Sequence, residues 1–458
     1  MPVRAGAVLA PGQPVTTGKS EEGALREEKS FCRLCNGGCG VNVTIDDHDR
    51  IVKIRGDHDH PMTRGYACFK GLQAAQSHHG PARLMHPMKR MADGTFQPIP
   101  SGQALDEIAA RLSRITADHG PNATGIFQGN GATSYALFTM MRSFLTALGS
   151  WQMFTTMTID QSAKYVSFER LGGWAGGSQE LETMDVVMMF GSNPLVSHGA
   201  IGVLCVDPVK RLKDALARGT KLISVDPRRS ETAAHAALFL QPLPGHDTAI
   251  AAAMIRIILD EGWEDTDFCA RFVGADRMAD LRTAVAPFVA ESVEVQAGLE
   301  PGQIEAGAAL CAPDSRRGVA ITGTGPNMAP HSNAGQHLID ALNVICGRFP
   351  RAGERLTAID VLSPPPTYRE EVIPAQRNWE KLPPSRIRGI GSIGGERLSG
   401  TLADEILTPG TDQIRALFVM GANPAISMPD QAKMVKALKS LDLLVSVDPF
   451  MTPTAMLA

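Results

Sequence analysis

Four cysteines near the start of the chain constrain its fold more than any other feature. Cys32, Cys35 and Cys39 follow the spacing Cys-x2-Cys-x3-Cys, and Cys68 comes after 28 further residues. Three thiolates can converge from one short loop, and the distant fourth completes a set that suits a 4Fe–4S cluster, whose irons each bind one thiolate. Four thiolates also suit structural zinc, although zinc ribbons pair two Cys-x2-Cys knuckles and the second is missing. We therefore expect a 4Fe–4S cluster, with zinc as the alternative.

Length and composition narrow the class of protein further. A chain of 458 residues should form two or three domains. The net charge of −4 and the lack of a basic run give no reason to expect nucleic acid as a partner. No stretch of 18 apolar residues occurs, so we expect no membrane span. Residues 1–29 lack the apolar core and the twin arginine of an export signal, which predicts a disordered lead on a cytoplasmic protein.

The other four cysteines are widely spaced and lie among apolar or small residues. Isolated cysteines of this kind are usually buried free thiols, and free thiols fit the reducing cytoplasm. They are Cys205, Cys269, Cys311 and Cys346.

An internal repeat is the second strong constraint on the fold. The apolar segment Asp185–Phe190 has the character of a buried strand and ends in Gly191-Ser192-Asn193-Pro194. About thirty residues later, a second such segment, Lys221–Val225, ends in Asp226-Pro227. This is the first copy of the repeat.

The same pair of segments recurs near the end of the chain. Ala416–Met420 ends in Gly421-Ala422-Asn423-Pro424, and Asp442–Val447 ends in Asp448-Pro449. Stretches rich in Lys, Leu and Ala lie between the strands of each pair, at residues 209–217 and 431–439, and predict helices. Each copy therefore predicts a strand–helix–strand crossover of a parallel sheet.

Parallel sheets of this kind bind ligands at the carboxyl ends of their strands. Gly and Asn in G-x-N-P permit close approach of a ligand to the backbone, and the Asp after the next strand can accept hydrogen bonds from a ribose or a base. Gly, Asn, Asp and Pro are also the usual residues of ordinary turns. Because the pattern occurs twice with similar spacing, we favour two nucleotide-type sites.

The segment after Asp226 carries further candidate ligand contacts. Arg228 and Arg229 could hold a phosphate or stack on a guanine. Pro244-Gly245-His246-Asp247 leads into a predicted helix, whose amino end could bind an anion. The proline-rich segment 362–384 is expected to be a surface excursion.

Together these motifs resemble the catalytic subunit of the molybdopterin oxidoreductases, the dimethyl sulfoxide reductase family that includes formate dehydrogenases and nitrate reductases. The resemblance rests on the amino-terminal cysteines followed by Lys-Gly and on the two G-x-N-P/D-P units, and it covers nearly all of residues 30–458. It implies an α/β fold: a small amino-terminal iron–sulfur domain, then two doubly wound parallel-sheet domains related by a pseudo-repeat. The implied boundaries are 30–85 for the cluster, 86–155 with 351–458 for one pterin dinucleotide, and 156–350 for the other.

The resemblance also implies roles for single residues. The four amino-terminal cysteines match the cluster ligands, and Lys70 matches the lysine between cluster and pterin that assists electron transfer. One molybdopterin guanine dinucleotide would be held by Gly191, Asn193, Asp226, Arg228, Gly245 and Asp247, and the other by Gly421, Asn423 and Asp448. The segment Thr322-Gly323-Thr324-Gly325 matches a glycine-rich turn near the active site. His246 stands where the family usually has Thr or Ser.

The ligand of molybdenum or tungsten decides the chemistry in this family, and it comes from the loop before the first G-x-N-P unit. That loop contains no Cys, and Asp160 occupies the matching position, with Ser162 the weaker candidate. Because the pterins supply soft sulfur, a hard carboxylate oxygen suits a high-valent metal. The alternative is that Asp160 merely caps a helix starting at Gln161.

The resemblance leads to a functional hypothesis. Formate dehydrogenases of the family carry Cys or selenocysteine followed by His, whereas this chain has Asp160-Gln161, which favours oxygen-atom transfer over formate oxidation. Electrons would pass through the 4Fe–4S cluster to a ferredoxin or to an iron–sulfur or flavin subunit. The alternatives are a non-catalytic scaffold resembling the large iron–sulfur subunit of complex I, and a zinc-containing nucleotide-binding protein.

One part of the family pattern has no counterpart in this chain. Full-length members continue into a carboxyl-terminal β-barrel that covers both pterins, and the sequence ends at Ala458, about where that barrel should begin. We expect a separate barrel subunit, a longer parent protein, or pterins that are left partly exposed.

Overall fold

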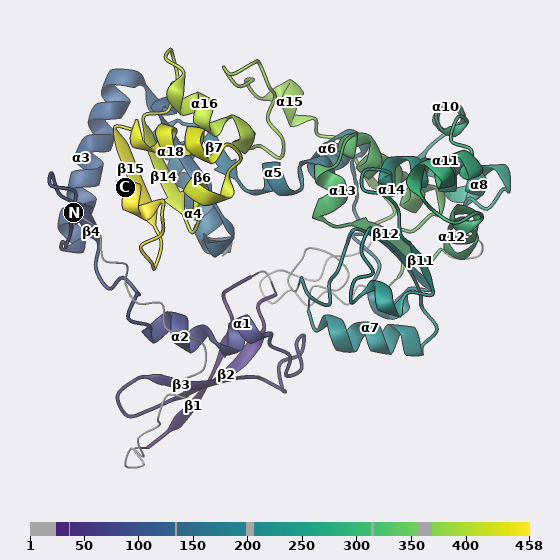
Figure 1. Ribbon diagram of the computed structural model, residues 1–458, viewed down its shortest axis with the longest axis horizontal. Coiled ribbons are helices and arrows are strands. Elements are labelled where there is room, and N and C mark those ends of the chain that lie inside the picture. The colour runs from purple at the N-terminus through teal and green to yellow at the C-terminus, as the bar shows by residue number, and fades with distance from the viewer. Residues whose placement is uncertain (1–23, 36, 133–134, 198–205, 313–315, 355–368) are drawn as a thin grey trace.

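The computed structural model describes residues 24–35, 37–132, 135–197, 206–312, 316–354 and 369–458. The chain is a mixed α/β protein with a small antiparallel unit and two parallel sheets of four strands (Figure 1). Among these residues, none of the helices combines the length and the apolar character that crossing a bilayer requires.

The antiparallel unit, which we call the cluster unit, holds all four amino-terminal cysteines. Its sheet has the order β1-β2-β3, and two short helices follow. The elements are β1 (Arg26–Phe31), β2 (Gly40–Ile45), β3 (Ile51–Gly56), α1 (Phe69–Leu72) and α2 (Ala74–His79). The prediction of a disordered lead over residues 1–29 is wrong from Arg26 onward, because β1 pairs along its whole length with β2. Residues 1–23 lie outside the described residues.

The β14 sheet has the order β15-β14-β6-β7, and its four strands are parallel. It combines two pairs of strands that are far apart in the sequence and lie side by side in Figure 1. Its strands are β6 (Thr124–Gln128), β7 (Gln152–Thr155), β14 (Ala416–Met420) and β15 (Leu443–Val447). The hairpin β4 (Met88–Arg90) and β5 (Phe96–Pro98) precedes it. Its helices are α3 (Ser101–His119), α4 (Tyr135–Leu148), α16 (Leu402–Leu407), α17 (Pro424–Ser427) and α18 (Gln431–Lys439).

The β9 sheet has the order β11-β10-β9-β12, and its strands are also parallel. Its strands are β9 (Val186–Phe190), β10 (Lys221–Val225), β11 (Leu238–Leu240) and β12 (Gly318–Thr322). Its helices are α6 (Ser162–Leu171), α7 (Pro208–Ala217), α8 (Asp247–Asp260), α9 (Thr266–Phe272), α10 (Ala275–Val285), α11 (Ala290–Ala297), α12 (Gln303–Cys311), α13 (Thr324–Met328) and α14 (Ser332–Ile345). The one-turn helix α5 (Met157–Asp160) connects the two sheets (Figure 1).

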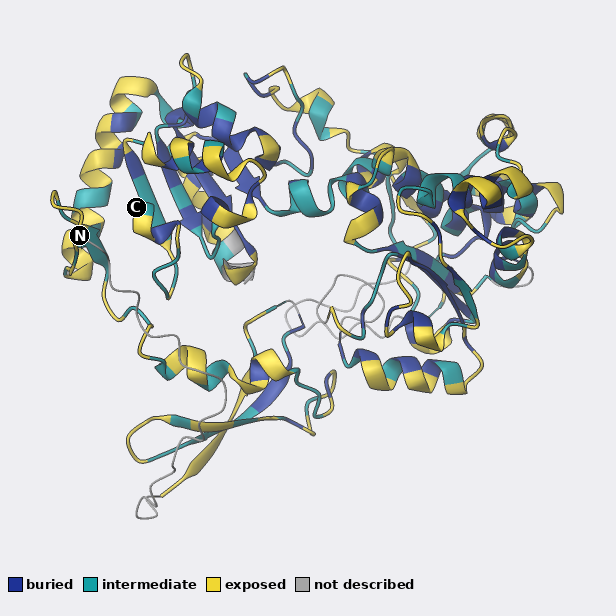
Figure 2. Cartoon of the chain, viewed as in Figure 1, coloured by how far each residue is buried: buried dark blue, intermediate teal, exposed yellow. Residues whose placement is uncertain are grey.

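Both parallel sheets are covered on both faces, as Figure 2 shows by their buried strands and half-exposed helices. Side chains alternate along a strand. In β9, Val186, Met188 and Phe190 pack with α8 and α12, whereas Val187 and Met189 pack with α7 on the opposite face. Two buried faces explain why these strands are continuously apolar, and the predicted doubly wound fold class is confirmed.

Several local predictions can be compared with the structure. The helices predicted at residues 209–217 and 431–439 are α7 and α18. The helix after the cluster unit, α3, begins at Ser101, and Pro100 occupies the cap position. The buried residues of α3 are Leu112 and Ile115, whereas Leu105 is exposed. Of segment 362–384, only residues from 369 on are described, and they include β13 (Val372–Ile373), paired with β8 (Gly173–Trp174), and α15 (Asn378–Lys381).

The cysteines outside the cluster unit are buried as predicted where the structure describes them. Cys269, Cys311 and Cys346 are free and buried in the core around α8. Cys205 lies outside the described residues.

Candidate cofactor-binding sites

The four cysteines predicted to bind the cluster lie around one loop and one short helix. Cys32 directly follows β1, and its backbone N–H donates to the Cys39 carbonyl at 2.8 Å, which closes the loop that also carries the second cysteine. Cys68 precedes α1, whose Gly71 packs against Cys32: a Cβ added to Gly71 would lie 3.1 Å from the Cys32 Sγ. The fold thus brings cysteines separated by 36 residues into one region.

The thiols act on one another electrostatically. Burial, together with the thiols of Cys32, Cys35 and Cys68, raises the pKa of Cys39 to about 11. Burial also raises the pKa of Cys32, while the nearby ammonium group of Lys70 acts in the opposite direction. Crowded thiols cannot all ionise without a compensating cation, and a bound metal supplies one. The donor set and its crowding fit a 4Fe–4S cluster, in which each thiolate binds a different iron. Within the described part of the chain, no three His, Cys, Asp or Glu side chains are grouped to hold a single metal ion.

Two residues next to Cys68 border the cysteines. Lys70 is exposed on α1. Tyr66 is partly buried, and burial raises its pKa, with further contributions from the thiols of Cys68 and Cys39 and from the carboxyl of Asp207. Because Asp207 directly precedes α7, the cysteine loop lies near the start of that helix. Sequence patterns did not single out Tyr66, since nothing local links it to Asp207.

In the β9 sheet, three loops meet where β9, β10 and β12 end. Gly191 has a φ of +56°, and its N–H donates to the Val225 carbonyl at 2.8 Å. The N–H of Gly323 donates to the Phe190 carbonyl at 2.8 Å, and a Cβ on Gly323 would lie 1.9 Å from the Gly191 carbonyl oxygen. The strand order reverses between β9 and β12, so the loops meet at the switch point where open α/β sheets bind ligands.

The β14 sheet repeats this arrangement. Gly421 has a φ of +54°, and its N–H donates to the Val447 carbonyl at 2.9 Å. The N–H of Gly129 donates to the Met420 carbonyl at 3.0 Å, and a Cβ on Gly129 would lie 2.7 Å from the Gly421 carbonyl oxygen. Gly129 was not predicted, although Gly129-Asn130-Gly131 has the same G-x-G pattern as Gly323-Thr324-Gly325.

The asparagine of each G-x-N-P unit connects its loop to the loop after the Asp-Pro pair. The Asn193 Oδ1 accepts the backbone N–H and the hydroxyl of Thr232, at 3.2 and 2.8 Å. The Asn423 Oδ1 accepts the same two groups of Thr454, at 3.1 and 2.7 Å. The two threonines were missed, although each stands six residues after its aspartate in the pattern D-P-x4-T.

The predicted aspartates lie at the ends of β10 and β15. The Asp226 Oδ1 accepts the Arg228 N–H at 2.8 Å, and the Asp448 Oδ1 accepts the Phe450 N–H at 3.0 Å. Asp226 also acts on Asp247, the first residue of α8. The pKa of Asp247 is raised mainly by burial and, to a smaller extent, by the charge of Asp226. Gly245, just before α8, has a φ of +94°. Neighbouring carboxyl groups of this kind can accept several N–H or O–H groups of a ligand.

The predicted arginines already have partners within the protein. Arg228 is exposed and forms an ion pair of 3.1 Å with Glu231, whose carboxylate also accepts the Asn193 amide at 2.7 Å. The guanidinium of Arg229 lies 5.6 Å from the ring centre of Phe239. Contact of either arginine with a phosphate or a guanine stays a prediction.

Asp160 lies between the two sheets, at the end of α5. It does not cap a helix from Gln161, because α6 begins at Ser162 with Gln161 in the cap position, so that alternative is wrong. The Asp160 Oδ1 accepts the Thr324 hydroxyl at 2.7 Å, and Oδ2 accepts the Gln161 amide at 3.1 Å. The structure thus brings together Asp160 and the glycine-rich turn that contains Thr324.

A cavity of about 1280 Å³ opens beside Gln161 and is lined by α6, α14 and β12. The Lys164 ammonium group in its wall donates to the Gln161 side chain at 2.7 Å. The Asp340 carboxyl, on α14, accepts the Ser167 hydroxyl at 2.6 Å. Burial raises the pKa of Asp340 to about 6 and lowers the pKa of Lys164. A half-buried acid and a half-buried base therefore face this cavity.

Comparison with known families decides the identity of the fold. Residues 83–458 match the family described as molybdopterin oxidoreductase, and residues 25–80 match the molybdopterin oxidoreductase Fe4S4 domain. The chain belongs to the molybdopterin oxidoreductase family. The predicted resemblance is confirmed, and the Fe4S4 match favours an iron–sulfur cluster over zinc in the cluster unit.

Members of the molybdopterin oxidoreductase family with different names resemble this chain to similar degrees. The F420-dependent formate dehydrogenase subunit alpha of Methanocaldococcus jannaschii is 26% identical, over 94% of this chain and 62% of its own length. The thiosulfate reductase molybdopterin-containing subunit PhsA of Salmonella typhimurium is 25% identical, over 93% and 56%. The solved structure of acetylene hydratase from Pelobacter acetylenicus shares the fold, with a TM-score of 0.77, 24% identity, and 94% and 62% coverage. The chain thus spans about three fifths of these relatives.

Proposed function

We propose that this chain carries the molybdenum or tungsten centre of an oxidoreductase and holds two molybdopterin guanine dinucleotides, one at each switch point. The duplication of the loops is the observation that carries this proposal. In both sheets a G-x-G turn, a G-x-N-P loop and an Asp–Thr loop meet at the carboxyl ends of the strands. A scaffold without pterins has no chemical need for two such sites.

The loop residues divide into two roles in this proposal. The oxygens of Asn193 and Asn423 are already bonded to threonines, so these side chains would shape the loops. The glycines would allow the dinucleotide close to the backbone, and the carboxylates would accept hydrogen bonds from guanine or ribose. The first site would use Gly191, Asp226, Arg228, Gly245, Asp247 and Gly323, and the second Gly129, Gly421 and Asp448.

Asp160 is our candidate ligand for the metal. Its carboxylate is oriented by the Thr324 hydroxyl and the Gln161 amide, one on each oxygen. A hard oxygen donor complements the soft sulfurs of two pterins and favours a high-valent metal. Asp160 is partly exposed rather than buried, so a lone pair can be offered to an incoming metal.

The reaction proposed is a two-electron oxygen-atom transfer. When bound, the metal and its pterins would supply oxygen-atom and electron exchange, and the 4Fe–4S cluster would carry electrons onward. The chain would contribute the cavity beside Gln161 as the substrate space, with Lys164 and Asp340 in its wall. The exposed Lys70 would assist electron transfer beside the cysteines, and a ferredoxin or an iron–sulfur or flavin subunit would be the electron partner.

Metal analysis of the purified holoprotein tests the proposal. We expect molybdenum or tungsten, together with release of about two GMP per metal after acid hydrolysis. The Asp160→Asn variant should keep its GMP and its iron but lose oxygen-atom transfer to or from the substrate. Iron without either heavy metal and without GMP would instead establish the non-catalytic scaffold.

Formate oxidation is the second candidate, because a formate dehydrogenase subunit is among the similar proteins. The presence of Asp160, where formate dehydrogenases have Cys or selenocysteine, weighs against it. Formate-dependent reduction of a viologen dye by the metal-loaded protein would establish this second candidate over oxygen-atom transfer.

A further inference from the structure

A buried arginine lies three residues after the end of α14, away from the cofactor loops. Arg348 is 4% exposed, and its Nη2 lies 3.1 Å from the Cys311 Sγ and also donates to the Cys311 carbonyl. Its Nε and Nη1 have no hydrogen-bond partner among the described residues. A guanidinium stays charged in proteins, so a buried one requires a negative partner.

The available negative partner is a thiolate. In the described part of the chain, Cys311 and Cys346 are the titratable groups that act on Arg348, and no carboxylate does so. Cys311 ends α12 and Cys346 directly follows α14; both are buried in the core around α8, where the Cys346 thiol acts on that of Cys311. The Cys346 thiol and the nearby Arg348 guanidinium lower the pKa of Cys311, while the pKa of Cys346 is raised.

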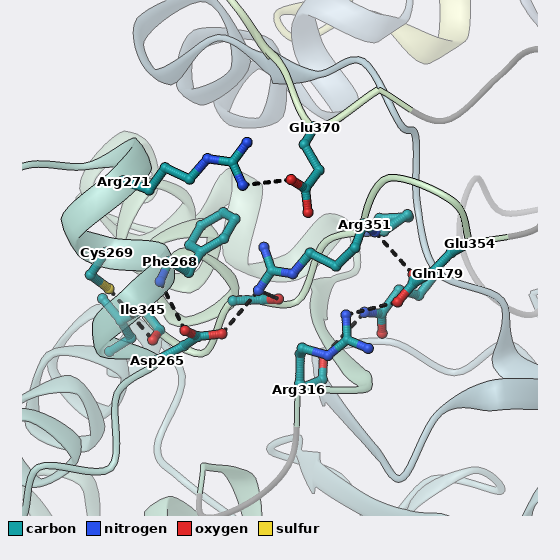
Figure 3. Close-up of polar contacts among 12 residues, drawn as sticks. Gln179, Asp265, Phe268, Cys269, Arg271, Arg316, Ile345, Arg351, Glu354 and Glu370 are labelled. Atoms are coloured by element: carbon teal, nitrogen blue, oxygen red, sulfur yellow. Dashed lines mark hydrogen bonds and ion pairs between the residues drawn. The ribbon is translucent and has the colours of Figure 1, made fainter.

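A third cysteine in the same core provides an internal comparison. Cys269 directs its thiol to the Ile345 carbonyl at 3.7 Å, beside Asp265 (Figure 3). Burial first, and then the carboxylates of Glu264 and Asp265, raise its pKa to about 11. Cys269 should therefore stay a neutral thiol where Cys311 is a thiolate.

The large cavity lies next to this pair. Ile345 and Arg348, within two residues of Cys346 in the chain, both line the cavity, whereas neither cysteine does. Cys311 itself is fully buried, so a reagent must be no larger than a few heavy atoms to reach its sulfur.

From this geometry we infer that Cys311 and Cys346 form a peroxide-reactive thiol pair that closes into a disulfide. The Cys311 thiolate attacks one oxygen of a hydroperoxide, the O–O bond breaks, and the sulfur becomes a sulfenic acid, while the other oxygen takes up a proton from solvent (the one that Cys311 released on ionising) and leaves as water or an alcohol. The Cys346 sulfur then attacks the sulfenic sulfur, and its proton leaves with the sulfenic oxygen as a second water. Two thiols are oxidised by two electrons and one peroxide is reduced.

Peptide mapping of the peroxide-treated holoprotein tests this inference without any variant. Trypsin separates the three cysteines, because Arg271 and Arg282 lie between Cys269 and Cys311, and Arg316 and Arg317 lie between Cys311 and Cys346. After treatment with hydrogen peroxide and alkylation of the remaining thiols, we expect peptides 283–316 and 318–348 to be joined. Cys269 should be recovered as alkylated thiol. Recovery of both pair peptides as free thiols, or equal oxidation of Cys269, would overturn the inference.

Variants then separate the roles of the two cysteines. Cys346→Ser should halt the reaction at a Cys311 sulfenic acid that dimedone traps, whereas Cys311→Ser should give no trapping at Cys346. Cys269→Ser is the matched control and should still form the disulfide. Arg348→Gln should slow the oxidation of Cys311 at neutral pH by roughly tenfold or more, because the thiolate loses its cation. Dimedone labelling of Cys346 in place of Cys311 would contradict the assignment.

Discussion

Replacing Asp340 with asparagine should change how the stability of the protein depends on pH. Asp340 accepts hydrogen bonds from Ser167 at 2.6 Å and from Gln336 at 3.0 Å, and the ammonium group of Lys164 faces it from α6. Asparagine can keep both contacts, since its oxygen accepts from Gln336 and its amide donates to the Ser167 oxygen. The substitution therefore removes the titration and leaves the packing intact.

The magnitude follows from the shift in pKa. Burial raises the pKa of Asp340 from the ordinary 3.8 to about 6. The folded protein therefore binds more protons at this site than the unfolded chain does between these two pH values. Stability falls as pH rises through that window, by about 1.4 kcal/mol per pKa unit and thus ~3 kcal/mol in all. This contribution is favourable to folding below about pH 4 and is fully lost above about pH 6.

The assay compares the thermal midpoints of wild type and Asp340→Asn at about pH 4.5 and about pH 7.5, at equal cofactor loading. About 1.5 pKa units of this window lie between the two pH values, so the variant should gain ~2 kcal/mol on the wild type, or roughly 4–8 °C in the midpoint of a domain of about 200 residues. Asp276→Asn removes an exposed carboxyl on α10 and should leave the wild-type pH dependence unchanged. A constant difference between Asp340→Asn and wild type at the two pH values would refute the reasoning.

Three further predictions concern the loops. Asn423→Ala should lower the free energy of unfolding by about 1–2 kcal/mol, because two donors of Thr454 lose their acceptor. Urea unfolding measures this loss, with Ser427→Ala as the exposed control. Gly191→Ala should cost at least ~1–2 kcal/mol, since its φ is +56° and its Cβ would lie 2.7 Å from Pro326; a pterin content equal to that of wild type would contradict its proposed role. Cys68→Ser should abolish the visible absorbance of the iron–sulfur cluster, whereas retention of all four irons would show that Cys68 is no ligand.

The sequence predicted those parts of the fold in which a local pattern and a buried environment coincide. The strands β9, β10, β14 and β15 are predominantly apolar because helices cover both faces of each sheet, and their loops carry the repeated G-x-N-P and D-P signals. The strand β1 was missed for the opposite reason. Its residues Arg26–Phe31 are all exposed, so pairing with β2 holds this strand in place and no apolar alternation marks it.

The parts of the site that could not be predicted depend on packing between distant segments. Lys164 and Asp340 are brought together because α6 packs on α14, and nothing near either residue in the sequence indicates the other. Gly129 was not predicted as a site residue for a different reason: a single G-x-G turn is a weak signal in a sequence. Only its contact with Gly421 shows that it is the counterpart of Gly323.

The two switch points differ in how they are connected to the cluster unit, and this difference is testable. The segment that follows the cluster unit is hydrogen-bonded to the loop after β15. The Leu84 N–H donates to the Pro449 carbonyl at 2.8 Å, and Arg83 forms an isolated antiparallel β-bridge with Phe450. The corresponding loop after β10 is held instead by the local ion pair of Arg228 with Glu231.

Loss of the cluster should therefore loosen the β14 switch point more than the β9 switch point. Hydrogen exchange of two matched amides reports this, because the N–H groups of Phe450 and Arg228 both donate to the aspartate two residues earlier. In cluster-free protein, exchange at Phe450 and Leu84 should accelerate well beyond that at Arg228. Equal acceleration at Phe450 and Arg228 would mean that the cluster stabilises both loops alike, and that the Leu84–Pro449 contact transmits nothing.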